Sequence, residues 1–431
     1  MIARYTLPEM GALWSEESKF RSWLRVEIEA AKAMAHYKMI PARAAAAIEK
    51  KAKFDVAEIN RIEKETNHDV IAFTTNVGSY IGDDAKYLHF GLTSSDVVDT
   101  ALSFLLKQSA EIIDKKIDQA QEEIKKLALR HKETPSIGRT HGVLAEPMTA
   151  GLKFAVWYTE LKRAQERFKA ATENVSVGKI SGSVGNFANV EPKIEAYVCQ
   201  RMGLKPAEVS TQVIQRDRHA QFITSIALLG SSLERFCTEI RNLQRTEIGE
   251  IYEGFSKGQK GSSSMPHKKN PITAERISGI ARLLRGYAVS SMENMVLWHE
   301  RDIAHSSVER VIIPDATILI DYALHKFIEL LQGLVIDEKR MLENIYYRGG
   351  IVFSQRLLLK LTDAIGSREQ AYKIVQNHSL AALEDDNSFR ESVLKDKVIS
   401  KYLKKPEIEE CFELDYYLRN VDKIFLRVFG K

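Results

Sequence analysis

Long stretches in which apolar residues recur every three or four positions constrain the fold of this 431-residue chain more than any other feature. The most regular stretch contains Phe154, Trp157, Leu161, Ala164, Phe168, Ala171 and Val175. Similar spacing runs from Val98 to Leu127 and from Phe222 to Leu243. Side chains three and four apart share one face of a helix, so the pattern predicts helices far longer than the usual ~11–12 residues. Since strand signals are few, we predict an all-α fold with a central bundle of long, nearly parallel helices.

The same pattern divides the chain into three predicted helical domains. Residues 1–92 are typical of short helices, residues 93–341 hold the long periodic stretches, and residues 342–431 return to short amphipathic helices. A chain of this length can bury the cores of several domains. Within the middle domain, residues 176–192 are rich in Gly, Ser and Asn and are predicted to be non-helical, with a short hairpin.

Composition and charge exclude several classes of protein. The 62 basic and 58 acidic residues leave a net charge of +4, which is too weak a bias to indicate nucleic-acid binding. No run of about 18 apolar residues indicates a membrane span, and the N-terminal residues lack the order of a signal peptide. The three cysteines, Cys199, Cys237 and Cys411, are scattered and odd in number. They fit reduced thiols, so we expect a cytoplasmic protein without nucleic-acid or membrane partners.

A polar loop at residues 258–271 separates two of the helical stretches. It reads Gly-Gln-Lys-Gly-Ser-Ser-Ser-Met-Pro-His-Lys-Lys-Asn-Pro. Its hydroxyls, ammonium groups and backbone N–H groups suit an anionic, oxygen-rich ligand. Taken alone, such a loop could equally be a solvated connector.

Histidines and charged residues gather in other polar segments. The histidines in or beside such segments are His68, His89, His141, His219, His267, His299 and His305. Ion pairing between helix ends is the structural alternative for the charged neighbours. Neither a metal-binding motif such as His-Glu-x-x-His nor a P-loop or dinucleotide-binding glycine motif is present. The remaining hypothesis is cofactor-free acid–base chemistry with a histidine, a loop hydroxyl and several cations.

Residues 261–271 resemble the signature loop of the fumarase/aspartase superfamily, whose members eliminate fumarate or a close relative from a succinyl compound. Within it, the chain resembles the adenylosuccinate lyase family from residue 4 to about residue 356. The motifs that carry this resemblance are Arg4-Tyr5, Thr66-Asn-His-Asp69, His89-Phe-Gly-Leu-Thr-Ser94, Arg139-Thr-His141, Ser210-Thr-Gln212, Arg216-Asp-Arg-His219, Trp298-His-Glu-Arg-Asp302 and Ser306-Ser-Val-Glu-Arg310.

The resemblance implies β-elimination of fumarate from adenylosuccinate, giving AMP, and from SAICAR, giving AICAR, both in purine nucleotide biosynthesis. The proton removed lies beside a carboxylate and is weakly acidic, so elimination needs a base and cations that stabilise the dianionic intermediate. The resemblance assigns Ser262 as the base and His141 as the general acid. It implies that Lys268 assists, that Glu275 orients His141, and that His68 contacts the substrate near it. No metal or other cofactor is expected.

The resemblance also implies a set of substrate-binding residues. The positions that hold the succinyl carboxylates are Thr93, Ser94, Gln212, Ser263, Lys268 and Asn270. Those that bind the nucleotide, chiefly its phosphate, are Arg4, Tyr5, Arg301, Ser306 and Arg310. Further expected contacts are Asn67, His68, Asp69, His89 and Thr140. Because the family is homotetrameric with each site built from three subunits, we expect a homotetramer with shared sites.

Two other interpretations stay open. His267 disfavours argininosuccinate lyase, fumarase and aspartase, but a 3-carboxy-cis,cis-muconate cycloisomerase can share the Met-Pro-His-Lys segment of the loop. A catalytically inactive helical scaffold is the alternative from a different class. The chain also departs from the family pattern at Leu144, where close relatives often carry His, and at Ser264, where many have Ala. The third serine leaves the assignment of the base by position less definite.

Overall fold

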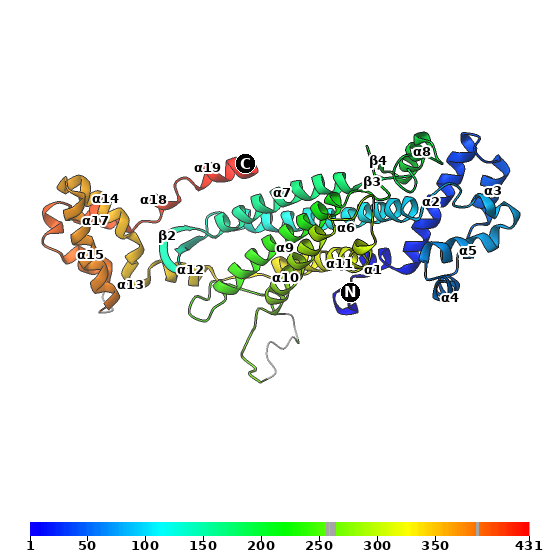
Figure 1. Ribbon diagram of the computed structural model, residues 1–431. Helices are drawn as coiled ribbons and strands as arrows, with labels where there is room; N and C mark the ends of the chain where they lie inside the picture. Colours follow the sequence, from blue (N-terminus) through cyan, green and yellow to red (C-terminus); the bar gives the residue numbers. More distant parts are fainter. Residues whose placement is uncertain (256–257, 259–263, 385–387, 431) are drawn as a thin grey trace. The chain divides into compact units, whose positions relative to one another are not determined.

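The computed structural model describes residues 1–255, 258, 264–384 and 388–430, and this part of the chain is predominantly helical (Figure 1). Strands in the described residues form two-stranded sheets only. The prediction of an all-α fold is therefore confirmed. Ser262 and Ser263, which the resemblance assigns to the base and to carboxylate binding, lie outside the described residues.

The long helices lie where the apolar spacing predicts them. They are α6 (Ser94–Arg130), α7 (Ala150–Val175), α9 (Asp217–Leu243), α10 (Ile272–Glu293) and α11 (Ala304–Gln332). On α7 the predicted stripe is the buried face, with Phe154, Leu161 and Phe168 fully buried. Burying a stripe of this kind removes apolar surface from water, which stabilises helices of this length.

The helices that precede the long ones are short, as predicted, except for one of 21 residues at Glu16–His36. They are α1 (Pro8–Leu13), α2 (Glu16–His36), α3 (Ala42–Lys51), α4 (Val56–Thr66) and α5 (Asp69–Ile81), with 3₁₀ segments η1 (Ala3–Tyr5) and η2 (Asp83–Tyr87). Side chains cap three of them, since Ser15 accepts from the N–H of Ser18, Asp55 from the N–H of Glu58 and His68 from the N–H of Ile71. Phe20 on α2 and other apolar side chains of these helices share one core.

Short helices also follow the long ones. They are α12 (Glu338–Ile345), α13 (Tyr347–Gly350), η3 (Ile351–Phe353), α14 (Ser354–Ile365), α15 (Arg368–Glu384), α16 (Phe389–Lys395), η4 (Ile399–Lys401), α17 (Lys405–Glu409), η5 (Glu410–Phe412), α18 (Asp415–Leu418) and α19 (Val421–Phe429). Phe353, Phe389 and Phe412 belong to a separate core in this region. The predicted change from long to short helices is therefore correct.

The strands include a detail of the fold that was predicted wrongly. No hairpin occurs within residues 176–192: β3 (Val177–Gly178) pairs in parallel with β4 (Lys205–Pro206), which follows α8 (Pro192–Met202). The hairpin lies instead at residues 135–149, where β1 (Pro135–Thr140) pairs antiparallel with β2 (Val143–Thr149). A further antiparallel pair joins β5 (Ile251–Tyr252) to β6 (Val335–Ile336).

The chain divides into two compact units, each built from separate segments. The first comprises Met1–Gln119, Arg163–Arg235 and Arg276–Phe327, and the second comprises Ala120–Lys162, Phe236–Glu275 and Ile328–Lys431. The division into domains at residues 92 and 341 stays a prediction. Among the described helices, none combines the length and apolar character that crossing a membrane requires.

Candidate active site

A cavity of about 680 Å³ in the first unit is lined by residues that come from distant parts of the sequence. The assigned residues among them are Asn67, His68, Asp69, Thr93, Ser94, Gln212, Arg301, Ser306 and Arg310. Apolar side chains such as Trp14, Trp23 and Leu102 complete the walls. This size, with apolar walls and a few convergent polar groups, is typical of sites for small molecules.

The junction of α4 and α5 presents three of the lining residues. Asn67 ends α4 in the left-handed conformation, with φ 50°, which Asn tolerates better than most residues. His68 caps α5, and its Nδ1 accepts from the N–H of Ile71 at 3.3 Å. In this arrangement the neutral ring carries its proton on Nε2, which leaves that N–H available to a ligand. The junction therefore orders Asn67 and His68 through local contacts, whereas Asp69 is also held by Arg310 of α11.

Cations converge on one side of the cavity. The Arg310 guanidinium donates to the Asp69 carboxylate at 2.6 Å. Burial raises the pKa of Asp69, but Arg310 and the N–H of Val70 outweigh it and hold the pKa below its usual value. The half-buried Lys19 ammonium lies 4.2 Å from the ring centroid of Phe20, and burial together with repulsion from Arg310 lowers its pKa. An anion bound here would offset both positive charges.

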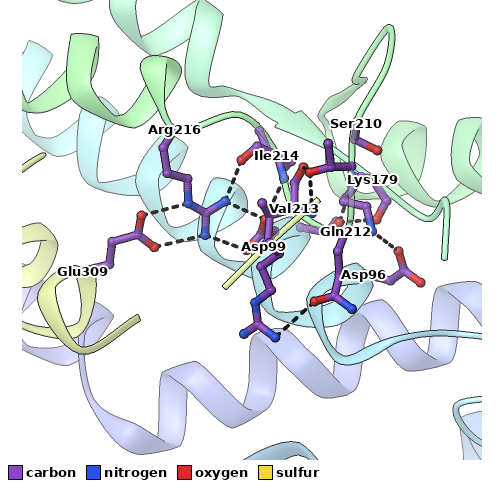
Figure 2. Close-up of polar contacts among 12 residues, drawn as sticks. Asp96, Asp99, Lys179, Ser210, Gln212, Val213, Ile214, Arg216 and Glu309 are labelled. Atoms are coloured by element: carbon purple, nitrogen blue, oxygen red, sulfur yellow. Dashed lines mark hydrogen bonds and ion pairs between the residues drawn. The ribbon is translucent and has the colours of Figure 1, made fainter. Parts of the chain in front are cut away.

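The start of α6 presents Thr93 and Ser94. The Asp96 carboxylate accepts from the N–H of Thr93 at 2.8 Å, which is one of the two hydrogen bonds of a capping box. The same carboxylate accepts from the Lys179 ammonium at 2.5 Å, and both side chains are fully buried (Figure 2). Asp96 also accepts from the backbone N–H groups of residues 181 and 182. One carboxylate therefore fixes the first turn of α6 against a separate segment.

Arg216, Asp99 and Glu309, which line the cavity, form a buried ion cluster (Figure 2). Arg216 donates to both oxygens of Asp99, at 2.7 and 3.0 Å, and to both oxygens of Glu309, at 2.8 and 3.0 Å. Burial raises the pKa of Asp99, but Arg216 outweighs it and lowers the pKa to about 2. For Glu309 burial prevails over Arg216 and raises the pKa. Asp99 is thus the firmly ionised partner of the guanidinium.

Two buried histidines flank this cluster. Burial and the charge of Arg216 lower the pKa of His219 to about 3 and the pKa of His305 to about 4. His305 also lines the cavity. Both rings are therefore neutral at physiological pH, and their role differs from that of a titrating acid or base.

His89, Arg4 and Tyr5 are assigned residues of the first unit that are not among the lining residues of this cavity. The Nδ1 of His89 lies 2.6 Å from the carboxylate of Glu27. Arg4 is exposed on η1, and the ring of Tyr5 packs edge-on against Tyr322 with 5.2 Å between centroids. Their roles in binding stay predictions.

The β1–β2 hairpin of the second unit exposes His141 at its tip. Thr140 pairs with Val143, and the two residues between them, His141 and Gly142, have φ of 54° and 78°. Positive φ at both central residues is the requirement of a tight type I′ turn, which Gly satisfies readily and His does not. Thr140 is exposed beside it. The chain thus places an imidazole at a strained, solvent-facing position, which is a common feature of functional sites.

Arg139 anchors the strand that leads to His141. It donates to both oxygens of the fully buried Glu250, at 2.6 and 3.0 Å. Asn344 donates to the same carboxylate at 2.7 Å. A bidentate pair of this kind is among the strongest and most directional side-chain contacts. Glu250 therefore limits the movement of the hairpin close to its tip.

The end of the signature loop is held by two residues that the sequence did not single out. Glu253 accepts from the N–H groups of Thr273 and Ala274 and so caps α10. Gln244 donates to the carbonyl of Lys269 at 2.8 Å. The assigned residues of this part are Lys268, Asn270 and Glu275, the last of them exposed in the first turn of α10. Like His141, they belong to the second unit and do not line the cavity of the first.

Comparison with known proteins decides the family. A family model described as "Lyase" matches residues 3–286, and one described as "Adenylosuccinate lyase C-terminus" matches residues 350–428. The chain is 50% identical over 433 residues to the adenylosuccinate lyase of Aquifex aeolicus, which covers 100% of this chain and 99% of the relative. It is 49% identical over 428 residues to that of Bacillus subtilis, with 99% of each chain covered. The chain belongs to the adenylosuccinate lyase family.

Solved structures place this family member in the predicted superfamily. A fumarate lyase from Mesorhizobium sp. BNC1 matches with a TM-score of 0.91 at 25% identity, covering 100% of this chain and 99% of that one. A 3-carboxy-cis,cis-muconate lactonizing enzyme from Pseudomonas putida matches with a TM-score of 0.89 at 25% identity, covering 99% and 97%. Identity to the adenylosuccinate lyases is about twice as high, which favours that family over the muconate alternative.

The cavity adds residues for which the sequence predicted no role. They are Lys19, Asp99, Arg216, His305 and Glu309. Arg216 and Glu309 occur within the family motifs, where their charges were visible but their partners were not. His305 was noted only as one of the histidines in polar segments. Lys19 and Asp99 offered no signal, because an isolated charge in an amphipathic helix is more often a solvated residue.

Proposed function

We propose that this chain catalyses the elimination of fumarate from adenylosuccinate, giving AMP, and from SAICAR, giving AICAR. The observation that carries this proposal is the identity of about 50% to curated adenylosuccinate lyases over essentially the whole chain. The enzyme would be a carbon–nitrogen lyase of purine nucleotide biosynthesis. The reaction is an acid–base elimination for which the residues below suffice.

The charges of the cavity support an anionic substrate with two recognition ends. Arg301, Ser306 and Arg310 would bind the phosphate, because guanidinium groups match phosphate oxygens in geometry and charge. Thr93 and Ser94 would bind a succinyl carboxylate, since they stand where α6 begins and exposed backbone N–H groups favour an anion. Gln212 would complete that carboxylate site, and its Oε1 already accepts from Arg301 at 3.1 Å.

The proton transfers are assigned to residues outside this cavity. His141 would donate a proton to the leaving purine nitrogen, a task that its exposed position on the hairpin tip supports. Ser262 would remove the proton beside the carboxylate, after neighbouring cations and N–H groups of the loop lower the pKa of its hydroxyl. Lys268 would stabilise the negative charge that accumulates on the substrate. Glu275 would orient His141, and His68 would contact the substrate nearby.

A homotetramer with shared sites accounts for two features. Apolar side chains stay exposed on the long helices, including Leu228, Leu283, Val289, Met292 and Val311. Exposed apolar faces on helices of this kind favour burial against further copies of the chain. The proposed proton-transfer residues and the cavity also belong to different units of one chain. Sites completed by neighbouring subunits would bring both sets together in a cytoplasmic tetramer.

An ultraviolet assay of the purified protein with adenylosuccinate tests the activity directly. No cofactor or metal is added, and fumarate and AMP are identified by chromatography. The expected result is equimolar release of both products at a rate that a chelator does not change. The same assay with SAICAR should release fumarate and AICAR.

The assay also separates the alternatives. Turnover of 3-carboxy-cis,cis-muconate without turnover of adenylosuccinate would transfer the assignment to the cycloisomerases. Absence of turnover with every succinyl substrate, in a protein that is folded and tetrameric, would support the inactive scaffold. Release of AMP that depends on an added metal would contradict the proposed acid–base chemistry.

A further inference from the structure

Arg216 has a place in the site for which neither the family motifs nor the substrate assignments give a reason. Its side chain is 2% exposed, and it lines the cavity beside the proposed substrate-binding residues. It follows directly on the segment that carries Gln212 and precedes α9. A cation in such a place would ordinarily be assigned to the substrate's negative charge.

The hydrogen bonds of Arg216 argue against a direct contact of this kind. A guanidinium has five N–H donors. Nε donates to Glu309, Nη2 donates to Asp99 and Glu309, and Nη1 donates to Asp99. The fifth donor, on Nη1, reaches the carbonyl of Ile214 at 2.7 Å. All five donors are engaged within the protein, so Arg216 has none to offer to a ligand.

Each of these partners belongs to a segment that presents a substrate-binding residue. Asp99 lies on the first turns of α6, after Thr93 and Ser94, and it also accepts from the N–H of Ile214 at 2.8 Å. One carboxylate therefore holds both the guanidinium of Arg216 and the backbone close to Gln212. Figure 2 shows this contact from α6 to the segment of residues 210–216.

Glu309 makes the corresponding connection to α11. It lies next to Arg310 and one helical turn after Ser306, so its position sets the positions of both. The hydrogen bond from Arg301 to Gln212 adds a second link between the segment ahead of α11 and the segment of residues 210–216. Together these contacts form one hydrogen-bond network. Arg216 is the only group in this network that contacts the carboxylates of both Asp99 and Glu309.

We propose that Arg216 is a positioning residue that holds Gln212 in register with Ser306 and Arg310 across the substrate cavity. The inference rests on the proposed function and adds a residue that acts through others. Lysine could not replace it, because a compact ammonium lacks the planar fork that engages two carboxylates at once.

The test compares Arg216→Lys with the wild-type enzyme in the adenylosuccinate assay. We expect KM to rise about tenfold or more and kcat to stay within about threefold, because misplaced binding groups weaken substrate binding. A merely structural loss would reduce the amount of active enzyme, which lowers the apparent kcat at unchanged KM. Arg285→Lys is the matched control, since Arg285 makes an exposed pair with Glu234 and does not line the cavity.

Glu309→Gln is the second variant, and it decides the matter if Arg216→Lys does not fold. It leaves Arg216 paired with Asp99 but weakens the connection to α11, so a smaller rise in KM is expected. Unchanged KM in the folded variants, with an active wild-type enzyme, would overturn the inference alone. A wild-type enzyme without turnover of adenylosuccinate would overturn the proposed function, and the inference with it.

Discussion

The Nδ1 of His89 lies 2.6 Å from Oε1 of Glu27, and the backbone N–H of His89 donates to the other oxygen of that carboxylate at 3.0 Å. Glu27 is 1% exposed, and His89 has a left-handed φ of 56°. One buried carboxylate on α2 thus fixes both the ring and the backbone of a strained residue shortly before α6. Burial lowers the pKa of His89, but Glu27 outweighs burial and raises it.

Glu27→Gln should destabilise the protein most at mildly acidic pH. The folded pKa of His89 lies above its unfolded value of about 6.5, so the stabilisation is complete below that pH and is lost as pH rises through the folded pKa. We expect a loss of about 1–3 kcal/mol near pH 6, because the variant removes a charge-assisted hydrogen bond. Thermal unfolding midpoints from pH 6 to pH 9 measure it.

Glu17→Gln is the control for this measurement. Glu17 lies on the same helix and forms an exposed pair with Arg21, which should contribute less than about 1 kcal/mol. A destabilisation by Glu27→Gln that is equal at every pH would show that the charge of His89 does not contribute.

The pKa of His219 predicts a pH dependence of protein stability that is opposite in sign to that of His89. Its folded pKa, about 3, is below the unfolded value of about 6.5, so its contribution is present above pH 6.5 and is lost as pH falls. Between pH 7 and pH 5 the resulting loss in the free energy of unfolding amounts to about 2 kcal/mol. His219→Gln should therefore lose less stability on acidification than the wild type. Unfolding midpoints from pH 5 to pH 7.5 check this, and an unchanged slope would contradict it.

The helices could be predicted from the sequence because their signals are local. The apolar spacing around Phe154 and Phe168 reports which face of α7 is buried, whatever that face packs against. The hydrogen bond between Asp96 and the N–H of Thr93 at the start of α6 is likewise contained within four residues. The hairpin was misplaced because Gly, Ser and Asn indicate a turn without specifying a partner strand, and the strand partner of residue 177 is residue 205.

The site was predictable only in part, for the same reason. Motifs identified residues such as Asn67 and Arg310, which the structure places around one cavity. They gave no indication of the pairs that hold these residues, because Arg216 and its partner Asp99 are far apart in the sequence. The sequence alone does not show which residue a charged side chain contacts. Lys19 is a further charged residue whose place in the cavity the sequence did not indicate.

Lys19→Met should weaken substrate binding. The ammonium lines the cavity, packs over Phe20 and has a lowered pKa, and a bound phosphate would stabilise its charge. Losing a hydrogen bond between charged groups costs about 1.5–3 kcal/mol, so KM for adenylosuccinate should rise roughly tenfold or more. Inorganic phosphate should also become a weaker competitive inhibitor.

Lys53→Met provides the matched control for Lys19. The Lys53 ammonium lies 4.6 Å from the ring centroid of Tyr80 and is not among the cavity-lining residues. The two variants lose similar contacts with an aromatic ring, of about 0.5–1 kcal/mol. If both variants changed KM equally, the effect of Lys19 would be on stability rather than on the substrate.

His141→Ala and Ser262→Ala should each abolish turnover while the proposed tetramer persists. Removing a general acid typically costs about 100-fold or more in rate, and the exposed side chain of His141 contributes little to packing. Steady-state rates and light scattering measure the two properties separately. Dissociation or unfolding of either variant would indicate a structural role for that residue instead.

Mixing two inactive variants tests whether sites are shared between subunits. His68 lines the cavity of the first unit, whereas His141 belongs to the second. If each site takes His68 from one subunit and His141 from another, tetramers reassembled from equal amounts of His68→Ala and His141→Ala contain some sites with both histidines. Random assembly gives intact residues at about one quarter of the sites, so activity should return to about that fraction of the wild-type value. A mixture of His68→Ala with the double variant is the control and should stay inactive. If subunit exchange is verified and the first mixture is also inactive, both histidines act within one chain.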